Sequence, residues 1–200
     1  PDITLRFENP QIIDDVSFHP CVRINSWEQQ RLLSFVPPDG KFTLFNYRVR
    51  GSLSAIIKAN GSIKFTPERG DVNLSVNATN IPGLVSGSLN GEMTSLSMTI
   101  NFPVSVTSCA LVVNQGSFTF DSMTHTLVWN IGRVSPKLTP AITGTVNRSM
   151  YEDTETFTKV SLNFCIINHA ASGLKFKHLD CNQSYPVRKG VKFTTYSGRY

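Results

Sequence analysis

The sequence has 200 residues, of which 40% are apolar and 16% are charged, and its formal net charge at pH 7 is +5. This composition excludes an intrinsically disordered protein and is typical of a globular chain long enough to bury a real core. No apolar run approaches the length of a membrane-spanning helix, and nothing at Pro1 resembles a signal peptide. The chain begins within a strand-like pattern, which predicts that it is a piece excised from a longer protein.

The first strong structural signal is a Pro-Pro-Asp-Gly turn at residues 37–40, between two apolar runs. Proline fixes φ and Asp-Gly supplies turn chemistry, so residues 32–36 and 41–49 are predicted to form a hairpin with a purely structural turn. Residues 27–35 are the one stretch whose pattern could pass for a helix, and the two prolines are expected to cut it short.

Alternation of apolar and polar residues with a period of two covers most of the remaining chain. Residues 71–78 and 95–102 each place three apolar side chains on one face, and residues 117–120 and 126–131 flank a turn as a hairpin. Short strands with Gly, Pro and Asn between them predict an antiparallel β-sandwich. Further strands are expected at residues 159–168, 173–179 and 191–196.

Two soft breaks in this pattern, near residues 50–54 and 149–155, indicate how the chain is organised. We expect an all-β, immunoglobulin-like antiparallel β-sandwich of two subdomains, with the second inserted in the first. The predicted limits are about 1–53 and 155–200 for subdomain A, and about 54–154 for the inserted subdomain B.

The cysteines bear on the compartment in which the protein works. They are widely spaced with no C-x-x-C pair, and Cys21, Cys109 and Cys165 lie in apolar strand contexts, where Cys is commonly a small buried hydrophobe. Two disulfides remain open if the protein is secreted, and four N-x-S/T sequons point the same way. Such triplets also arise by chance in a β-rich chain, so composition leaves both compartments open. The fourth cysteine is Cys181, and the sequons are at Asn60, Asn77, Asn147 and Asn182.

No arrangement of residues points to catalysis. The sequence lacks G-x-S-x-G, H-E-x-x-H and a glycine-rich phosphate loop, and its four histidines have no metal-ligand spacing. A Cys165–His169 dyad would have nothing to orient it. We therefore expect neither an enzyme nor a cofactor. The strands near residues 173–179 and 191–196 are either ordinary core strands or an edge that accepts an extended peptide.

The positive charge gathers near the end of the chain. No RNP-like, helix-turn-helix or zinc-finger spacing accompanies it, so we expect no nucleic-acid partner. The modest net charge favours an ordinary solvated surface over a patch that faces acidic lipid. The basic residues of this segment are Lys175, Lys177, Arg188, Lys189, Lys192 and Arg199.

Several blocks of the sequence resemble the landmarks of one known family and occur in the same order along the chain. DDVSFHPCVR, followed by WEQQRLLSFVPPDGKFTLFNYRV, resembles the signature of the mu homology domain of clathrin-adaptor medium chains. GSFTFDSMTHTLVWNIGRVSP is similar to the later hairpin of that family, and ASGLKFKHLD and GVKFTTYSGRY are similar to its closing strands. Within the family, DDVSFHPC and SGLKFKHLD most resemble the medium chain of adaptor-protein complex 3.

The resemblance implies an elongated domain of two subdomains that binds Tyr-x-x-Φ sorting signals in the cytosolic tails of membrane cargo. The peptide would add as a strand beside the closing edge, in transport towards lysosome- or vacuole-related organelles. The implied partners are these peptides and the other subunits of a heterotetrameric adaptor complex, with the membrane surface reached indirectly. The implied location is cytoplasmic and peripheral on Golgi and endosomal membranes and transport vesicles. The sequons would then be accidental and the four cysteines free thiols.

Five residues match peptide-binding positions of the family. Phe193 stands where complex 2 has a Trp beside the tyrosine pocket, and Thr195 stands where it has an Arg. Phe176, Leu179 and Thr194 fall at positions that line the pocket for Φ.

The chain also departs from the family pattern. The family's F-x-D segment, whose Asp accepts the hydroxyl of the cargo tyrosine, is expected upstream of Pro1 or is lost. Thr195 cannot stack or carry charge as Arg does, which implies weaker or altered peptide binding. The lysine cluster with which complex 2 reads phosphoinositide is not matched in SCALVVNQGSFTF, so that lipid site is not expected.

Two other interpretations stay open from the sequence. One is an extracellular, disulfide- and glycan-bearing β-sandwich of an adhesion protein or receptor, which a mass measurement with and without reductant would reveal. The other is a mu-like endocytic adaptor outside the tetrameric complexes, which would share the fold.

Overall fold

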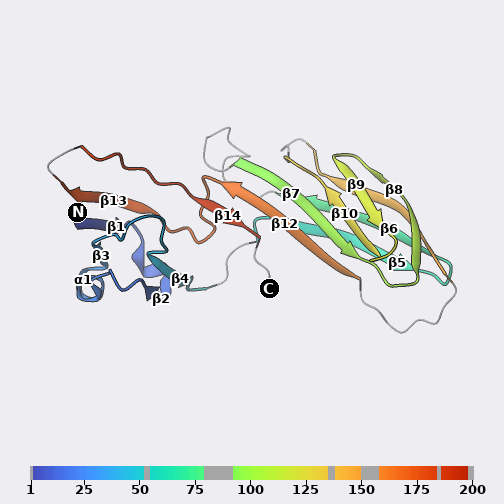
Figure 1. The fold of residues 1–200 in the computed structure, drawn as a ribbon. Coiled ribbons are helices and arrows are strands. Elements are labelled where there is room, and N and C mark those ends of the chain that lie inside the picture. The colour runs from blue at the N-terminus through green and yellow to red at the C-terminus, as the bar shows by residue number, and fades with distance from the viewer. Residues whose placement is uncertain are drawn as a thin grey trace. The chain divides into compact units, whose positions relative to one another are not determined.

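The computed structural model describes residues 2–51, 55–78, 92–134, 138–149, 158–183 and 186–197. This part of the chain consists mostly of strands, with one short α-helix and one 3-10 turn (Figure 1). Neighbouring strands run antiparallel in every sheet, which confirms the predicted all-β antiparallel fold. Among the described residues, no helix is long and apolar enough to cross a bilayer.

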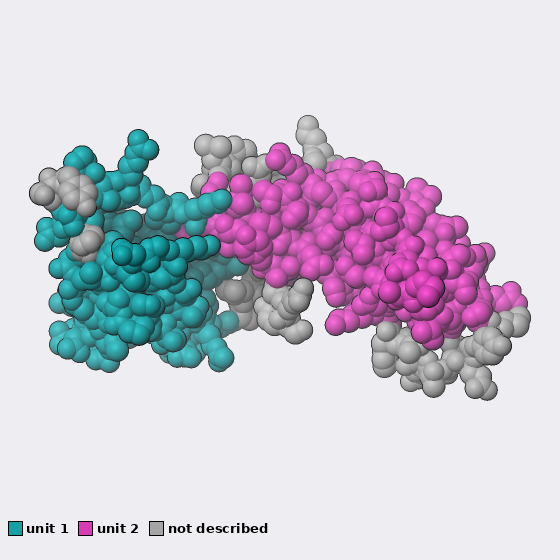
Figure 2. Space-filling view, in the orientation of Figure 1, with its two compact units in different colours: residues 1–54, 170–192 teal, residues 55–169, 193–200 magenta. Residues whose placement is uncertain are grey.

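The chain divides into two compact units, each made of two segments (Figure 2). Unit 1 comprises residues 1–54 and 170–192, and unit 2 comprises residues 55–169 and 193–200. The limits expected from the sequence instead placed everything after residue 154 with the first segment. Two strands in that region, β12 (Lys159–Ile167) and β14 (Thr194–Tyr196), belong to unit 2 because β12 pairs with β7 (Glu92–Asn101) and β14 pairs with β12.

Unit 1 contains a three-stranded sheet of order β13–β1–β3, a two-stranded sheet of β2 and β4, and one helix. The three-stranded sheet joins the two segments of the unit, because β1 pairs with β13 from the second segment. The elements are η1 (Pro10–Ile12), α1 (Ile24–Gln30), β1 (Asp2–Phe7), β2 (Ile13–Phe18), β3 (Leu32–Phe35), β4 (Phe45–Val49) and β13 (Phe176–Asn182).

The predicted hairpin around the Pro-Pro-Asp-Gly turn is wrong. Strand β3 before the turn pairs with β1, and strand β4 after it pairs with β2, so the two strands share no ladder. Residues 41–44, expected to be strand, precede β4 without strand structure. The turn therefore carries the chain from one sheet to another, with Gly40 at a φ of 79°. Partners that are distant in sequence decide this pairing.

The predicted helical stretch also divides differently. Helix α1 begins at Ile24 and ends at Gln30, and Arg31 follows in the left-handed region with a φ of 52°. Strand β3 starts at the next residue, well before the prolines. The reversal at Arg31 therefore ends the helix, and the prolines do not.

Aromatic side chains fill the core of unit 1. The ring of Phe7 lies 6.2 Å from that of Trp27, 5.8 Å from that of Phe45 and 5.2 Å from that of Phe176, between centroids. The first two contacts are edge-to-face, the arrangement that ring quadrupoles favour. Phe7 is 3% exposed, so one residue of β1 joins the helix, the second sheet and β13.

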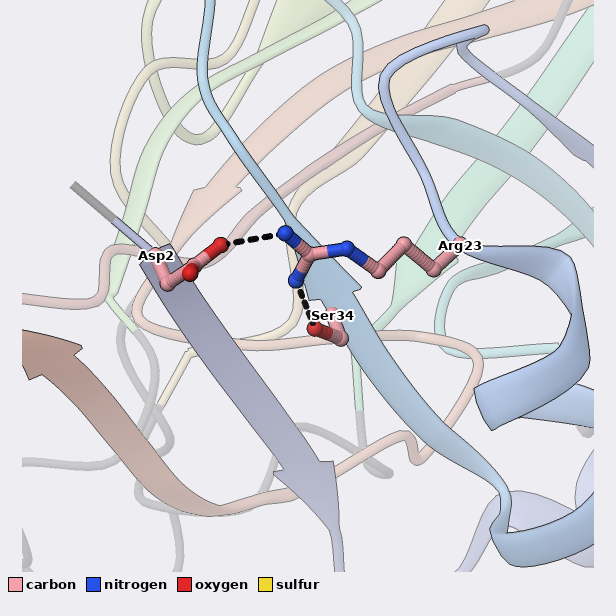
Figure 3. Close-up of polar contacts among 3 residues, drawn as sticks. All are labelled: Asp2, Arg23 and Ser34. Carbon is pink, nitrogen blue, oxygen red and sulfur yellow. Dashed lines mark hydrogen bonds and ion pairs between the residues drawn. The ribbon is translucent and has the colours of Figure 1, made fainter.

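Polar contacts fasten the start of the helix to the three-stranded sheet. The guanidinium of Arg23 donates to the carboxylate of Asp2 at 2.6 Å and to the hydroxyl of Ser34 at 2.7 Å (Figure 3). Asp2 belongs to β1 and Ser34 to β3, so the residue that precedes α1 is tied to both strands.

Unit 2 is a sandwich of two sheets with orders β14–β12–β7–β10–β9 and β5–β6–β11–β8. Side chains from both sheets belong to one buried cluster, so the sheets pack face to face. The strands not yet defined are β5 (Lys58–Phe65), β6 (Arg69–Asn77), β8 (Val106–Val113), β9 (Ser117–Asp121), β10 (Thr126–Asn130) and β11 (Ala141–Arg148).

The strand faces predicted for this region are confirmed. The hairpin of β9 and β10 forms with Asp121 opposite Thr126. Trp129 of β10 is fully buried, and its indole Nε1–H donates to the carbonyl of Gln115 at 2.8 Å, which satisfies its polar atom. The predicted inward side chains are buried on β6 (Val72, Leu74 and Val76) and on β7 (Leu96, Met98 and Ile100).

All four cysteines are free, as predicted, and each of them is partly exposed. The expected burial of Cys109 and Cys165 within strands is therefore wrong. Cys109 is only partly buried against the core of unit 2, and Ile166 takes the buried position next to Cys165. The remaining burial of Cys109 is enough to raise the pKa of its thiol.

Candidate functional site

Strand β13, which carries two of the five predicted site residues, lies at the edge of its sheet. Phe176 and Leu179 are half-buried and pack against the core of unit 1. Phe176 stands opposite Phe7 on β1, and Leu179 stands opposite Leu5. An edge strand with partly exposed apolar side chains can accept an extended peptide through its free backbone groups.

A β-bulge brings these two side chains onto the same face. Simple alternation predicts that Phe176 and His178 share one face and that Lys177 and Leu179 share the other. In the structure, Arg6 pairs with His178 and Phe7 pairs with Phe176, so Lys177 has no partner opposite it. The extra residue shifts the alternation, and the strand becomes half-buried at Phe176 and Leu179 but exposed at Lys177 and His178.

The other three predicted residues lie at β14, the edge strand of the five-stranded sheet in unit 2. Phe193 is half-exposed, Thr194 is exposed and Thr195 is 8% exposed. The carbonyl of Phe193 accepts a hydrogen bond from the backbone N–H of Asn168 at 2.8 Å, which extends the pairing with β12 by one step.

Thr195 is held inside its own unit. Its hydroxyl donates to the backbone carbonyl of His169 at 2.7 Å, and the residue stands opposite Ile166 of β12. Burial lowers the pKa of the His169 imidazole. The Thr195 side chain thus anchors the edge strand, a role that the sequence alone did not indicate.

The structure thus places the predicted residues in two groups. Phe176 and Leu179 belong to unit 1, and Phe193, Thr194 and Thr195 belong to unit 2. In each group the strand is an edge of its sheet within the part of the chain that is described.

Tyr196 is an additional candidate that the sequence analysis missed. Its side chain is 68% exposed, and it lies two residues after the exposed Thr194 on the same strand. In the sequence, period-two alternation already places Tyr196 on the same face of the strand as Thr194, opposite to Phe193 and Thr195. A large exposed aromatic residue on an edge strand is a typical contact for an extended peptide.

No metal site accompanies these strands in the described part of the chain, where no group of three or more His, Cys, Asp or Glu could hold an ion.

Comparison with known proteins gives one family. The family described as "Adaptor complexes medium subunit family" matches residues 1–200. "AP-3 complex subunit mu" of Dictyostelium discoideum is 39% identical over 204 residues, and "AP-3 complex subunit mu-1" of Homo sapiens is 35% identical over 207 residues. Each alignment covers 100% of this chain and 48% of the relative, so the chain spans about half the length of the curated relatives it matches.

Two structures of other proteins share the fold. A homology model of the full-length AP-3 complex in an intermediate open conformation aligns with a TM-score of 0.60 at 20% identity, covering 99% of this chain and 56% of that one. The Fcho1 mu homology domain of Danio rerio with bound Eps15 peptide aligns with a TM-score of 0.59 at 12% identity, covering 90% of this chain and 72% of that one.

Proposed function

Because the chain belongs to the adaptor complexes medium subunit family, we propose that it is the cargo-recognition domain of an adaptor-complex medium chain. It binds Tyr-x-x-Φ sorting signals in the cytosolic tails of membrane proteins, for vesicle transport towards lysosome- or vacuole-related organelles. Its relatives among AP-3 mu subunits favour complex 3 over an adaptor outside the tetrameric complexes. Family membership also agrees with the prediction that the chain is not an enzyme, and it leaves the extracellular adhesion module without support.

The partners and location follow from the same proposal. The other subunits of a heterotetrameric adaptor complex hold the domain near the membrane, so that its contact with the membrane surface is indirect. The complex acts in the cytoplasm, peripherally on Golgi and endosomal membranes and on transport vesicles.

One observation carries the peptide-binding part of the proposal: both strands named from the sequence are edge strands with partly exposed apolar residues. An extended peptide gains affinity from main-chain hydrogen bonds to an edge and gains specificity from pockets for alternate side chains. From the matched family positions, we assign Phe193 of unit 2 to the cargo tyrosine, and Phe176 and Leu179 of unit 1 to Φ. Thr194, the exposed residue beside Phe193, is a further candidate contact for the peptide. Thr195 shapes the strand beside the tyrosine, because its hydroxyl is already engaged by His169.

The first test is the substitution Phe193→Ala, measured by calorimetric titration of the intact protein with a Tyr-x-x-Φ peptide. Loss of an aromatic wall at a binding hot spot is expected to weaken binding by about 1–3 kcal/mol. Phe118→Ala is the matched control, because Phe118 is also half-exposed but lies on β9, at the opposite edge of the same sheet. Unchanged affinity after Phe193→Ala would place the tyrosine site elsewhere.

The second test addresses Phe176, whose ring also packs against Phe7. Phe176→Ser is expected to weaken selection for Φ, but it also removes a core contact and lowers the melting temperature. A double-mutant cycle separates the two effects, with Φ of the peptide changed to Ala. A coupling energy near zero between Phe176 and Φ would remove Phe176 from the site.

A further inference from the structure

The outer face of the three-stranded sheet in unit 1 contains a hollow of about 270 Å³. It lies on the face of β13 opposite to Phe176 and Leu179, which pack inward. It is therefore separate from the residues assigned to the sorting signal. Its lining consists of Thr4, Arg6, Leu32, Lys177, His178 and Asp180.

The strand register explains why these side chains converge. On β1, Thr4 and Arg6 are two residues apart and share one face, and they stand opposite Asp180 and His178 of β13. Leu32 of β3 stands opposite Arg6 on the other side.

The bulge adds a second cation to this face. Lys177 is the residue without a partner in the ladder, and it lines the hollow together with its neighbour His178. In a regular strand these two neighbours would point to opposite faces. Bulges re-aim side chains in this way and are over-represented at functional positions.

The charges of the hollow are unbalanced. Asp180 is 3.7 Å from the amine of Lys189, so this carboxylate has a cation of its own. Further along the same sheet, Asp2 is paired with Arg23 (Figure 3). Neither Arg6 nor Lys177 has a carboxylate partner in the part of the chain that the structure describes. Two cations therefore face the hollow with no anion assigned to them.

We propose that this hollow binds a phosphate group on a phosphorylated serine or threonine of an extended peptide segment. Two unpaired cations match the charge of a phosphate monoester, which is near −2, better than that of a single carboxylate. The guanidinium of Arg6, the amine of Lys177 and the hydroxyl of Thr4 supply donors for its three oxygens.

The shape and charge of the face favour a peptide over a membrane. The phosphate site is concave, and carboxylates at Asp180 and Asp2 accompany its cations, whereas an anionic membrane surface favours an uninterrupted basic patch. The side chains of the hollow stand on the outer face of the sheet, so an extended segment can lie across this face and leave the edge of β13 to the sorting signal. The cations are exposed, so binding is expected to be weak and to fall with added salt.

The test uses the intact protein and the peptide acetyl-Gly-Ala-phosphoserine-Ala-Gly-amide, which contains no Tyr-x-x-Φ signal. Two-dimensional NMR titration should shift the amides of Thr4, Arg6 and residues 177–180 saturably. The double substitution Arg6→Gln with Lys177→Gln should weaken binding about tenfold or more, as loss of charge-assisted hydrogen bonds does. Lys175→Gln is the matched control, because Lys175 is an exposed lysine of the same segment outside the hollow.

Four further samples decide between sources of the anion. Two are the same peptide with serine or with aspartate in place of phosphoserine, the third is inorganic phosphate, and the fourth is vesicles that contain phosphatidylinositol phosphate. Weaker binding of all four than of the phosphopeptide supports the proposal. Equal binding of the serine or aspartate peptide overturns it, as does binding of the vesicles or inorganic phosphate at least as tightly as the phosphopeptide. If the double variant does not fold, the shifts in the unaltered protein decide, and shifts centred outside the hollow overturn the proposal.

Discussion

Unit 2 buries seventeen apolar side chains in its described core, whereas unit 1 buries seven. Unit 2 packs aliphatic residues between two sheets, and unit 1 packs aromatic rings around Phe7 between small sheets and a helix. Hydrophobic stabilisation scales with buried apolar area, so unit 1 depends more heavily on each of its contacts.

This difference affects the two edge strands that we assign to cargo binding. Phe193 lies beside a large, independently packed sheet, so its substitution is expected to affect binding more than folding. Phe176 belongs to the smaller aromatic core, so the same kind of change affects both. Recognition and stability are therefore separable in unit 2 and coupled in unit 1.

The largest expected effect is the loss of the buried indole in unit 2. Trp129→Ala should lower the free energy of unfolding by about 3–5 kcal/mol, because it opens a cavity and leaves the carbonyl of Gln115 without its donor. Urea unfolding followed by circular dichroism measures this change, and Trp27 fluorescence reports unit 1 in the same variant. A loss below about 1 kcal/mol would show that the core of unit 2 is not closely packed at this point.

Gly144 tests how tightly the four-stranded sheet is built. It lies within β11 at a φ of +139°, and a Cβ atom there would clash with the carbonyl oxygen of Ala110 and lie 2.9 Å from the Cα of Leu111. Gly144→Ala should therefore cost about 2–3 kcal/mol, from backbone strain and steric overlap. Gly132→Ala is the control, because its φ is also positive but no atom lies within 4 Å of the added Cβ. If both variants lost the same free energy of unfolding, backbone strain alone would explain the loss, and the predicted steric overlap at Gly144 would be wrong.

Phe7→Leu examines the aromatic core of unit 1. The change keeps an apolar side chain but makes it smaller and removes ring contacts with Trp27, Phe45 and Phe176, and it should cost about 1–2 kcal/mol. Hydrogen exchange should show reduced protection in β1 and β3 and unchanged protection in β7 and β10. Equal loss of protection in both units would contradict separate cores.

Thr195→Val tests the anchor of β14. The variant leaves the carbonyl of His169 without the hydroxyl donor and should cost about 1 kcal/mol in thermal unfolding. Peptide affinity should change little, because this hydroxyl is assigned no contact with cargo. Thr194→Val, at the exposed neighbouring position, should leave the melting temperature unchanged. A greater loss from Thr194→Val than from Thr195→Val would reverse the assigned orientation of the strand.

The smallest expected effect concerns the β9–β10 turn of unit 2. A hydrogen bond from the hydroxyl of Thr124 and another from the backbone N–H of Met123 lower the pKa of Asp121. Its folded pKa lies below its unfolded one, so its contribution to stability is complete above the unfolded value and is lost as the pH falls through the folded value. The melting temperatures of the unaltered protein and Asp121→Asn should differ slightly at neutral pH and converge in acid. A difference that widens in acid would contradict this sign.

Local patterns predicted the strands of unit 2 well, because period-two alternation and a short hairpin turn depend on neighbouring residues. They failed at residues 32–49, where β3 and β4 choose partners that are distant in sequence. They also failed at Lys177, since a bulge shows only when the register against β1 is known. The family resemblance predicted that Phe176 and Leu179 belong to the same site, whereas alternation alone would have placed their side chains on opposite faces of the strand. Tyr196 was missed because the alternation groups it with Thr194 but does not say which face of β14 is exposed.

The central claim is that this domain recognises the tyrosine of an extended sorting signal. It is tested most directly by calorimetric titration of the intact protein with a Tyr-x-x-Leu peptide and with the matching Ala-x-x-Leu peptide. The account predicts saturable one-to-one binding of the first peptide and at least tenfold weaker binding of the second, equivalent to about 1.4 kcal/mol or more. Equal binding of the two peptides, or binding of neither, would contradict it.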